Sequence, residues 1–395
     1  MFEALEPLPA DPILGLSAAC TADPNPDKVD LTVGVYKDES GQTPVFDAIK
    51  QAQGLLTESE LTKSYLPQVG DANFNRGIRE LLLGADNPAL AEERVASVQT
   101  PGGCGALRIG AELIKETSPG ARVWVSAPTW PNHIPLIGSV GLEIVEYRYY
   151  DATSHSVDID GMLQDLAGAD AGDVVLLHGC CHNPCGADLS QEQWRQVTEV
   201  LAARGAMPFI DIAYQGLGQD LEADAYGVRH MAEKLPEVLI ASSCSKNLGL
   251  YRERTGATVF VGKSADSAAA LESHGTKAAR KIYSMPPAHG AILAGMVFTD
   301  DTLGQSWRTE LAAMCERING LRGMLDEKLT AVSGQDFSFI RRENGMFSFL
   351  GLSPEQVVRL REEFSVYMVG SSRINVAGVN HANIDYLAQS VARVL

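Results

Sequence analysis

The stretch that decides the fold is VLIASSCSKN, residues 238–247. Its first four residues are apolar and predict a buried strand, after which small hydroxyl residues lead to Lys246. Hydroxyl groups can donate hydrogen bonds to phosphate oxygens, and a lysine amine can form a Schiff base with a carbonyl compound. Further along the chain, Arg254 offers a planar fork of donors to the same phosphate. Taken alone, an ordinary strand end with an exposed turn lysine is the simpler interpretation, because surface lysines are common.

Three further segments favour a binding site. MPFIDIAY, residues 207–214, places Asp211 after an apolar run and Tyr214 shortly beyond it, where an acid and a phenol can face a heteroaromatic ring. VVLLHGCCHNPCG, residues 174–186, again puts polar side chains after an apolar strand. TPGGCGAL, residues 100–107, is a glycine-rich turn opening a helix, whose free N–H groups and dipole can bind phosphate.

Composition restricts the classes of function. The chain has 395 residues, of which 45% are hydrophobic and 21% charged, as in a soluble globular protein large enough for two domains. A net charge of -18 argues against nucleic-acid binding. No apolar run approaches the roughly 20 residues that span a bilayer, and the acidic start lacks the features of a signal peptide, so we expect a cytoplasmic protein.

The chain has seven cysteines, which is an odd number, and their spacing does not repeat; this predicts free thiols in a reducing compartment. Cys180 and Cys181 are adjacent and have no second Cys/His pair at zinc-ribbon spacing, so we expect no metal site.

Apolar strands alternate with amphipathic helices over residues 95–300. The strand candidates are 122–126, 174–178, 207–212, 238–242 and 257–261. Helices are predicted at 105–116 and at 190–203, the second opened by a capping box of Ser190 and Gln193. This alternation predicts a mainly parallel sheet covered on both faces, which binds ligands at the carboxyl ends of its strands.

The pattern changes after residue 305. A long helix near 305–332, short strands around 337–340 and 346–350, and a helix beginning at Ser353-Pro354 predict a smaller α+β domain.

Together these segments resemble the fold-type I pyridoxal phosphate enzymes, and among them the class I aspartate and aromatic amino acid aminotransferases. The resemblance extends almost end to end and includes VGVYKD (33–38), PTWPNH (128–133), PPAHG (286–290) and SRINVAG (372–378). It implies an α/β fold with a mainly parallel seven-stranded sheet in a large domain, plus a smaller α+β domain. The expected division is an N-terminal arm with part of the small domain at 1–44, a large cofactor-binding domain at 45–305, and a small C-terminal domain at 306–395.

The resemblance also implies roles in binding pyridoxal 5'-phosphate. Lys246 would hold the cofactor and move the substrate's proton, Asp211 would pair the ring N–H, and Tyr214 would meet the ring oxygen. The remaining cofactor-binding residues would be Gly102, Gly103, Cys104, Trp130, His133, Asn183, Ser243, Ser245 and Arg254, with Tyr65 reaching from the neighbouring subunit. For Trp130 and His133, core packing is the ordinary alternative.

Substrate binding by resemblance involves the backbone of Gly34, together with Trp130 and Asn183. Arg373 would clamp the α-carboxylate through two parallel hydrogen bonds. Arg280 would bind a side-chain carboxylate across the interface of a homodimer with shared active sites; a solvated helix arginine is the alternative.

Two departures from the family's pattern bear on affinity and substrate. Cys104 stands where the family often has threonine, and a thiol is a poorer donor than a hydroxyl. Met285 stands where aspartate-type members carry asparagine, which makes the expected pocket less polar.

We therefore expect a ping-pong aminotransferase with pyridoxal and pyridoxamine phosphate states. It would move the amino group of an aromatic amino acid (Phe, Tyr, Trp) or aspartate to 2-oxoglutarate. The alternatives are a strict aspartate aminotransferase and, less favoured, a pyridoxal phosphate lyase or decarboxylase. A non-catalytic binding protein is disfavoured because Lys246, Asp211 and Tyr214 are all present, and a dehydrogenase because no Gly-x-Gly-x-x-Gly follows the first strand.

Overall fold

The computed structural model describes residues 2–8 and 12–395. The chain divides into two compact units, one made of Pro44–Asn183 with Ala187–Arg317 and the other of Met1–Thr43, Pro184–Gly186 and Ile318–Leu395. We call the first the large unit and the second the small unit. Within the described residues, no helix combines the length and the apolar composition needed to cross a membrane.

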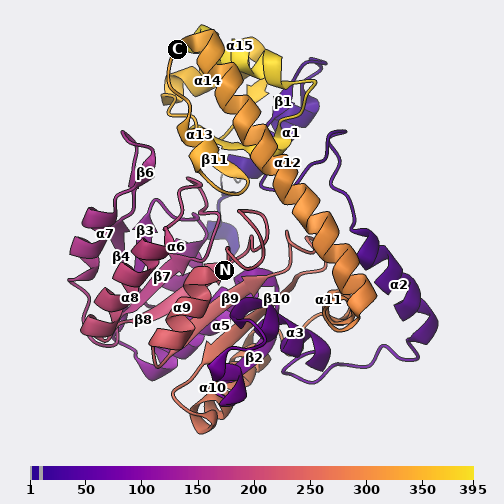
Figure 1. Ribbon diagram of the computed structural model, residues 1–395, viewed down its shortest axis with the longest axis vertical. Helices are drawn as coiled ribbons and strands as arrows, with labels where there is room; N and C mark the ends of the chain where they lie inside the picture. Colours follow the sequence, from indigo (N-terminus) through magenta and orange to yellow (C-terminus); the bar gives the residue numbers. More distant parts are fainter. Residues whose placement is uncertain (1, 9–11) are drawn as a thin grey trace. The chain divides into compact units, whose positions relative to one another are not determined.

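In the part that the structure describes, the large unit contains a seven-stranded sheet with the strand order β2-β10-β9-β8-β7-β3-β4 (Figure 1). The strands are β2 (Val95–Pro101), β3 (Arg122–Ala127), β4 (Glu143–Arg148), β7 (Val174–His178), β8 (Met207–Ile212), β9 (Val238–Ser243) and β10 (Thr255–Val261). From β9 to β4 all neighbours pair in parallel, whereas β10 is antiparallel to both β9 and β2. A parallel strand needs a crossover connection, which explains the helices between these strands.

Helices pack on both faces of this sheet. The helices of the large unit are α2 (Asp47–Ser59), α3 (Ala72–Leu83), α4 (Pro88–Ala91), α5 (Gly102–Thr117), α6 (His133–Gly138), α7 (Ile159–Leu166), α8 (Gln191–Arg204), α9 (Tyr226–Lys234), α10 (Ala265–Ile282) and α11 (Ala288–Thr299). Helices α5 and α10 contact each other and the sheet. Helices α3 and α9 form a second group that contacts the sheet, in which α9 also contacts α8 and α8 contacts α7. A small hairpin joins β5 (Tyr150–Asp151) to β6 (Ser156–Val157).

The contact between α5 and the sheet depends on a small residue. A Cβ on Gly110 would lie 2.4 Å from the Phe209 ring and 2.9 Å from Leu239, so glycine lets the helix approach closely. Both partners belong to the same buried core as Ile109 and Leu113 of α5. This packing holds the middle of α5 close against β8 and β9.

The small unit is an assembly of short elements around its own core. In it β1 (Val29–Asp30) pairs in parallel with β12 (Val366–Tyr367), and β11 (Phe347–Phe349) pairs antiparallel with β13 (Arg373–Asn375). The other elements are η1 (Phe2–Ala4), α1 (Pro12–Ala22), α13 (Phe339–Arg342), α14 (Pro354–Phe364), η2 (Val376–Gly378) and α15 (Ile384–Val394). Helix α12 (Asp301–Ser333) contains the division between the units and contributes Leu321, Leu325 and Leu329 to this core.

The sequence-based boundaries are accurate where buried apolar runs are continuous. The predicted strands 174–178 and 207–212 coincide with β7 and β8, and the capping box of Ser190 and Gln193 opens α8. The capping box of Ser353 and Gln356 likewise opens α14, with Pro354 at its start.

The strand predicted at 337–340 is wrong, because the chain forms the short helix α13 there. Phe337, Phe339 and Ile340 are all buried, and a short apolar run of this kind does not distinguish a strand from a helical turn. A helical turn instead directs the carbonyl of Ile340 to the guanidinium of the buried Arg322, at 2.8 Å.

Candidate active site

Lys246 lies in the turn that follows β9, at the carboxyl edge of the parallel strands. Its Nζ is 4.5 Å from the centroid of the Tyr214 ring. Burial lowers the pKa of Lys246, and Arg254 adds to this effect, while Asp211 and Cys104 oppose it. A lysine with a lowered pKa is more often neutral, and the neutral amine is the nucleophile that attacks a carbonyl carbon.

Asp211 lies near the end of β8 and is held from behind by His133. The distance from His133 Nε2 to Asp211 Oδ2 is 2.9 Å, and the His133 side chain is fully buried. Burial raises the pKa of Asp211, but the hydrogen bond and charge of His133, with smaller contributions from His178 and Lys246, outweigh it. The net result is a lowered pKa, so the carboxylate is ionised at neutral pH and can bind a protonated nitrogen.

A chain of polar groups continues behind His133. The hydroxyl of Thr129 lies 2.8 Å from His133 Nδ1 and 3.2 Å from His178 Nε2. The ring of His178 is 4.0 Å from the ring of His182, whose Nε2 is 3.0 Å from Ser126 Oγ. Burial lowers the pKa of His178 to about 3, with His133 adding to it, so this ring is neutral and fixes the Thr129 hydroxyl by hydrogen bonding.

Trp130 and Asn183 lie on loops that follow the central strands. The Trp130 ring is edge-on to the His133 ring, with centroids 5.2 Å apart and an interplanar angle of 88°. Asn183 is buried. Trp130 thus belongs to the same aromatic cluster as the histidine that holds Asp211.

A cradle of donors surrounds the start of α5. The serine hydroxyls of Ser243 and Ser245 are 3.1 Å apart, and Arg254 Nη1 lies 3.4 Å from Ser245 Oγ. A Cβ on Gly102 would lie 2.5 Å from Arg254 Nη2, and one on Gly103 would lie 3.2 Å from Ser243 Cβ. The first N–H groups of α5 have no intrahelical acceptor, so this cradle suits a phosphate.

Cys104 lies in the first turn of α5, which begins at Gly102, before the predicted start at 105. Its Sγ is 3.8 Å from the side-chain nitrogen of Asn132. Burial raises the pKa of the Cys104 thiol, and Arg254 and Lys246 offset this only in part. The thiol is therefore neutral and adds a weak donor to the cradle.

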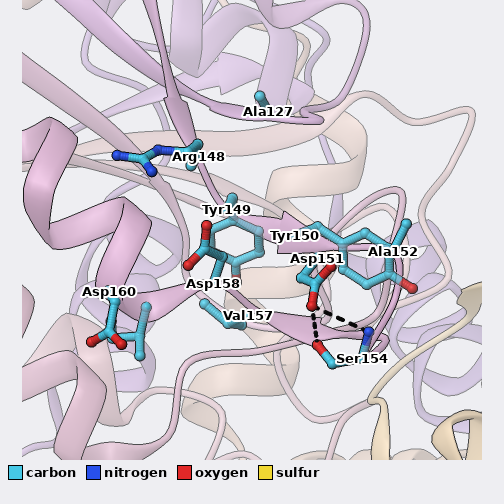
Figure 2. A pocket seen from close by; sticks show the side chains of 11 residues that line it. Ala127, Arg148, Tyr149, Tyr150, Asp151, Ala152, Ser154, Val157, Asp158 and Asp160 are labelled. Carbon is cyan, nitrogen blue, oxygen red and sulfur yellow. Dashed lines mark hydrogen bonds between the residues drawn. The ribbon is translucent and has the colours of Figure 1, made fainter.

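Another cavity in the large unit, of about 550 Å³, lies beside the β5–β6 hairpin and is bordered by Arg148, Asp151 and Asp158 (Figure 2). Two of its charged groups are already engaged, because Asp151 accepts hydrogen bonds from Ser154 and Arg148 pairs with Asp165. The predicted site residues do not line this cavity.

Comparison with known proteins agrees with this geometry. The model of the family "Aminotransferase class I and II" matches residues 26–391. The chain is 46% identical over 396 residues to the aspartate aminotransferase of Haemophilus influenzae, covering 100% of both chains. It is 46% identical over 394 residues to the aromatic-amino-acid aminotransferase of Pseudomonas aeruginosa, covering 100% of this chain and 98% of that one.

A solved structure of the aromatic-amino-acid aminotransferase from Burkholderia pseudomallei, covalently bound to pyridoxal phosphate, superposes with a TM-score of 0.98. The two share 45% sequence identity, with coverage of 100% of this chain and 99% of that chain. The chain belongs to the class I and II aminotransferases. The family, the fold class and the aminotransferase activity that the sequence predicts are thereby confirmed.

Two residues that are predicted to bind the cofactor or the substrate of a neighbouring subunit lie at the surface of the chain. Tyr65 is 86% exposed. Arg280, in the last turn of α10, is also exposed and donates a hydrogen bond to Ser284 Oγ. Their predicted roles require a second subunit and stay predictions.

The predicted substrate residues Gly34 and Arg373 belong to the small unit. Arg373 is buried, donates through Nη2 to the carbonyl of Thr32 at 2.7 Å, and places its Cζ 4.6 Å from the centre of the Phe347 ring. A Cβ on Gly34 would lie 2.5 Å from Cζ of Phe347. The structure therefore brings both predicted residues against the same phenylalanine ring.

Sequence reasoning assigned no role to Thr129 and His178, which continue the hydrogen-bonded chain behind Asp211, or to His182, whose ring lies against that of His178. A usable signal existed for His178. It ends the apolar strand beside that of Asp211, and the sheet register pairs the two residues directly. Two polar residues ending adjacent parallel strands are expected to be neighbours.

Proposed function

We propose that this aminotransferase moves the amino group of an aromatic amino acid or of aspartate to 2-oxoglutarate in a ping-pong reaction. The observation that carries the proposal is the constellation of Lys246, Tyr214 and Asp211. The amine lies over the phenol ring, and the amine and the carboxylate act on each other's pKa. The cofactor predicted from the sequence, pyridoxal phosphate, is confirmed.

The donor set of the large unit fits this cofactor. Two serine hydroxyls, the Arg254 guanidinium and the free N–H groups of α5 supply the neutral and cationic donors that a phosphate dianion needs. Asp211 offers an ionised carboxylate to a ring nitrogen, and Tyr214 and Asn183 offer donors to a ring oxygen. When bound, pyridoxal phosphate supplies an electron sink for the negative charge that develops at the substrate's Cα.

Lys246 has two proposed tasks. Its amine holds the cofactor covalently at rest, and it later carries the proton that leaves Cα of the amino acid. Both tasks require a lysine that is neutral for part of the cycle, which agrees with the lowered pKa caused by burial.

Asp211 has the complementary task of keeping a proton on the ring nitrogen. His133 holds the carboxylate at 2.9 Å, and Thr129 holds His133 in turn, so these two contacts fix the orientation in which the carboxylate would meet the ring nitrogen. A carboxylate with a lowered pKa favours the protonated form of the nitrogen that it contacts.

Arg373 is the proposed clamp for the substrate's α-carboxylate. The backbone of Gly34 and the side chains of Trp130 and Asn183 are proposed as further contacts of the substrate. Arg280 and Tyr65 are proposed to serve the active site of the second subunit in a homodimer, which agrees with their exposure. We also propose residues 45–305 as the cofactor-binding domain and 1–44 with 306–395 as its smaller companion, in a cytoplasmic protein.

The choice of substrate stays open between aromatic and acidic amino acids. An aspartate and an aromatic-amino-acid aminotransferase both match at 46% identity, so similarity favours neither. Met285 favours an apolar side chain and Arg280 favours a carboxylate, which together support an enzyme that accepts both. A strict aspartate aminotransferase is the alternative.

Single-turnover spectroscopy tests the proposal. Holoenzyme mixed with phenylalanine or with aspartate, without a keto acid, is expected to convert bound pyridoxal phosphate to pyridoxamine phosphate in both cases. Conversion by aspartate alone would establish the strict alternative, and conversion by neither would overturn the substrate assignment. Release of carbon dioxide without a keto acid would identify a decarboxylase.

A further inference from the structure

The small unit contains a buried carboxylate that the proposed chemistry does not use. Glu343 lies between α13 and β11 and is 3% exposed. Its Oε2 accepts hydrogen bonds from Arg322 Nη1 at 3.3 Å and from the Ser348 hydroxyl. In the described part of the chain, its Oε1 has no hydrogen-bond partner. Burying a carboxylate with one oxygen left without a hydrogen bond lowers the stability of the fold, so we look for a specific role that explains this residue.

Arg322 uses the rest of its guanidinium to hold the turn that leads into β11. It is 1% exposed and projects from α12. Besides Glu343, it donates to the carbonyls of Asn344 at 3.0 Å, Gly345 at 2.8 Å, and Phe347. Carbonyls carry no charge, so Glu343 is the group that neutralises this buried cation. The pair therefore fixes the backbone of residues 344–347.

This turn also leaves no space for movement on its other side. A Cβ on Gly186 would lie 2.4 Å from the Phe347 carbonyl oxygen, 3.1 Å from Glu343 Cβ and 3.2 Å from Arg322 Nη2. The amide of Asn344 donates to the Gly186 carbonyl at 2.8 Å. Pro184–Gly186 belong to the small unit, so the same pair supports this short segment of it.

Phe347 transmits the position of the turn to the residues proposed to bind substrate. The centre of its ring lies 4.6 Å from the Arg373 Cζ, and its Cζ would be 2.5 Å from a Cβ on Gly34. Strand pairing aligns Phe347 with Asn375 and Phe349 with Arg373, so β11 also sets the backbone of the arginine. A shift of the turn would displace Phe347 and hence Arg373.

We propose that Arg322 and Glu343 are positioning residues for the substrate's α-carboxylate: the buried ion pair holds the 344–347 turn and thereby the Phe347 ring against which Arg373 and Gly34 lie. This inference rests on the proposed role of Arg373. It assigns the pair an effect on substrate binding, with little effect on the proton transfer at Lys246.

The titration of Glu343 predicts a pH dependence of substrate binding that a purely structural ion pair would not give. Burial raises the pKa of Glu343 to about 7, although Arg322, Ser348 and Arg342 all act to lower it. The charged groups that act on the carboxylate are thus Arg322 of α12 and Arg342 of α13. As the pH falls through about 7, Glu343 gains a proton and Arg322 loses its counter-charge, so the turn is held less firmly.

The experiment compares the holoenzyme with Glu343→Gln, Glu343→Ala and a matched control, Glu327→Gln. Glu327 lies on α12 and, like Glu343, pairs with an arginine, here Arg341, but its side chain is 70% exposed. For each protein, kcat and KM for aspartate, the affinity for pyridoxal phosphate, and the affinity for succinate by calorimetry are measured from about pH 6 to about pH 8, around the pKa of Glu343.

In the parent and the Glu327 variant, KM and the succinate dissociation constant are expected to rise as the pH is lowered. In Glu343→Gln this rise is expected to be absent, because the amide cannot titrate. Glu343→Ala is expected to weaken succinate binding and raise KM about ten- to hundredfold at high pH, with kcat and cofactor affinity nearly unchanged.

The inference is overturned if the pH profiles of KM and of succinate binding are the same for Glu343→Gln and the parent. It is also overturned if kcat and cofactor affinity fall by as large a factor as KM rises. Should Glu343→Ala fail to fold, the comparison of the glutamine variant with the parent still decides. If the parent turns over no amino acid, the proposed function fails, and the succinate profiles continue to test the positioning role separately.

Discussion

Gly102 offers a sharp test of the phosphate cradle because its substitution moves a charged neighbour without removing any charge. Its φ is +71°, and a Cβ would lie 2.5 Å from Nη2 and 2.9 Å from Cζ of Arg254. Arg254 is itself held through Nη1 by the carbonyl of Tyr251 at 2.9 Å. In Gly102→Ala, the guanidinium must therefore leave the start of α5.

The expected cost has two separable parts. A left-handed conformation costs an alanine about 1–2 kcal/mol of folding stability relative to glycine. Displacing Arg254 removes a charge-assisted hydrogen bond to the phosphate, worth about 1.5–3 kcal/mol. The second part alone weakens the affinity for pyridoxal phosphate, by about ten- to hundredfold.

Gly172→Ala is the matched control, since this glycine has φ +91° and its Cβ would meet nothing within 4 Å. Urea unfolding of the apoenzymes should show a similar loss of stability in both variants. Titration of the apoenzymes with pyridoxal phosphate should show weaker binding in Gly102→Ala alone. If Gly102→Ala binds the cofactor as tightly as the parent, or if Gly172→Ala weakens it equally, the assignment of Arg254 to the phosphate is wrong.

Three further outcomes are expected. Arg280→Ala should raise KM for aspartate by about tenfold or more while leaving phenylalanine turnover unchanged, as steady-state kinetics with both substrates would show; an equal loss for both would contradict its role. Cys104→Thr should tighten cofactor binding several-fold, since a hydroxyl donates better than a thiol, and an unchanged dissociation constant would mean that only the backbone is used. Because burial lowers the folded pKa of His178 to about 3, its contribution to stability is complete above the unfolded pKa near 6.5 and is lost as the pH falls. Between about pH 7 and 5, the free energy of unfolding of the parent should therefore fall by about 1–2 kcal/mol more than that of His178→Gln, as measured by urea unfolding; parallel curves would contradict a neutral His178.

The strands that the sequence did not reveal are those whose polar residues have tertiary partners. In β2, the buried Gln99 accepts from the Asp71 amide at 2.8 Å and donates to the Pro287 carbonyl at 2.7 Å. Ser97 donates to Asn75 at 3.1 Å. Hydropathy alone cannot distinguish such satisfied polar groups from a surface loop. In β4, at the edge of the sheet, Glu143, Glu146 and Arg148 are exposed, which weakens the apolar signal.

The site could be predicted in so far as it depends on strand ends. Asp211 and Lys246 follow apolar runs, and the order of parallel strands brings such ends together. His178 ends the apolar strand beside that of Asp211 and could have been expected nearby, whereas its direct pairing with Asp211 depends on register, which the sequence does not display. Tyr65 and Arg280 were named from resemblance alone, and their exposure in a single chain is a property that the sequence could not indicate.

The antiparallel strand β10 explains why residues so distant in sequence form one cradle. Its register pairs Thr255 with Pro101 on one side and Gly256 with Ser243 on the other. The residue before Thr255 is Arg254 and the residue after Pro101 is Gly102, so antiparallel pairing places the guanidinium at the start of α5. A parallel strand in this position would enter from the opposite edge and carry Arg254 away from the serines. The direction of a single strand therefore joins the phosphate-binding turn of α5 to the turn that bears Lys246.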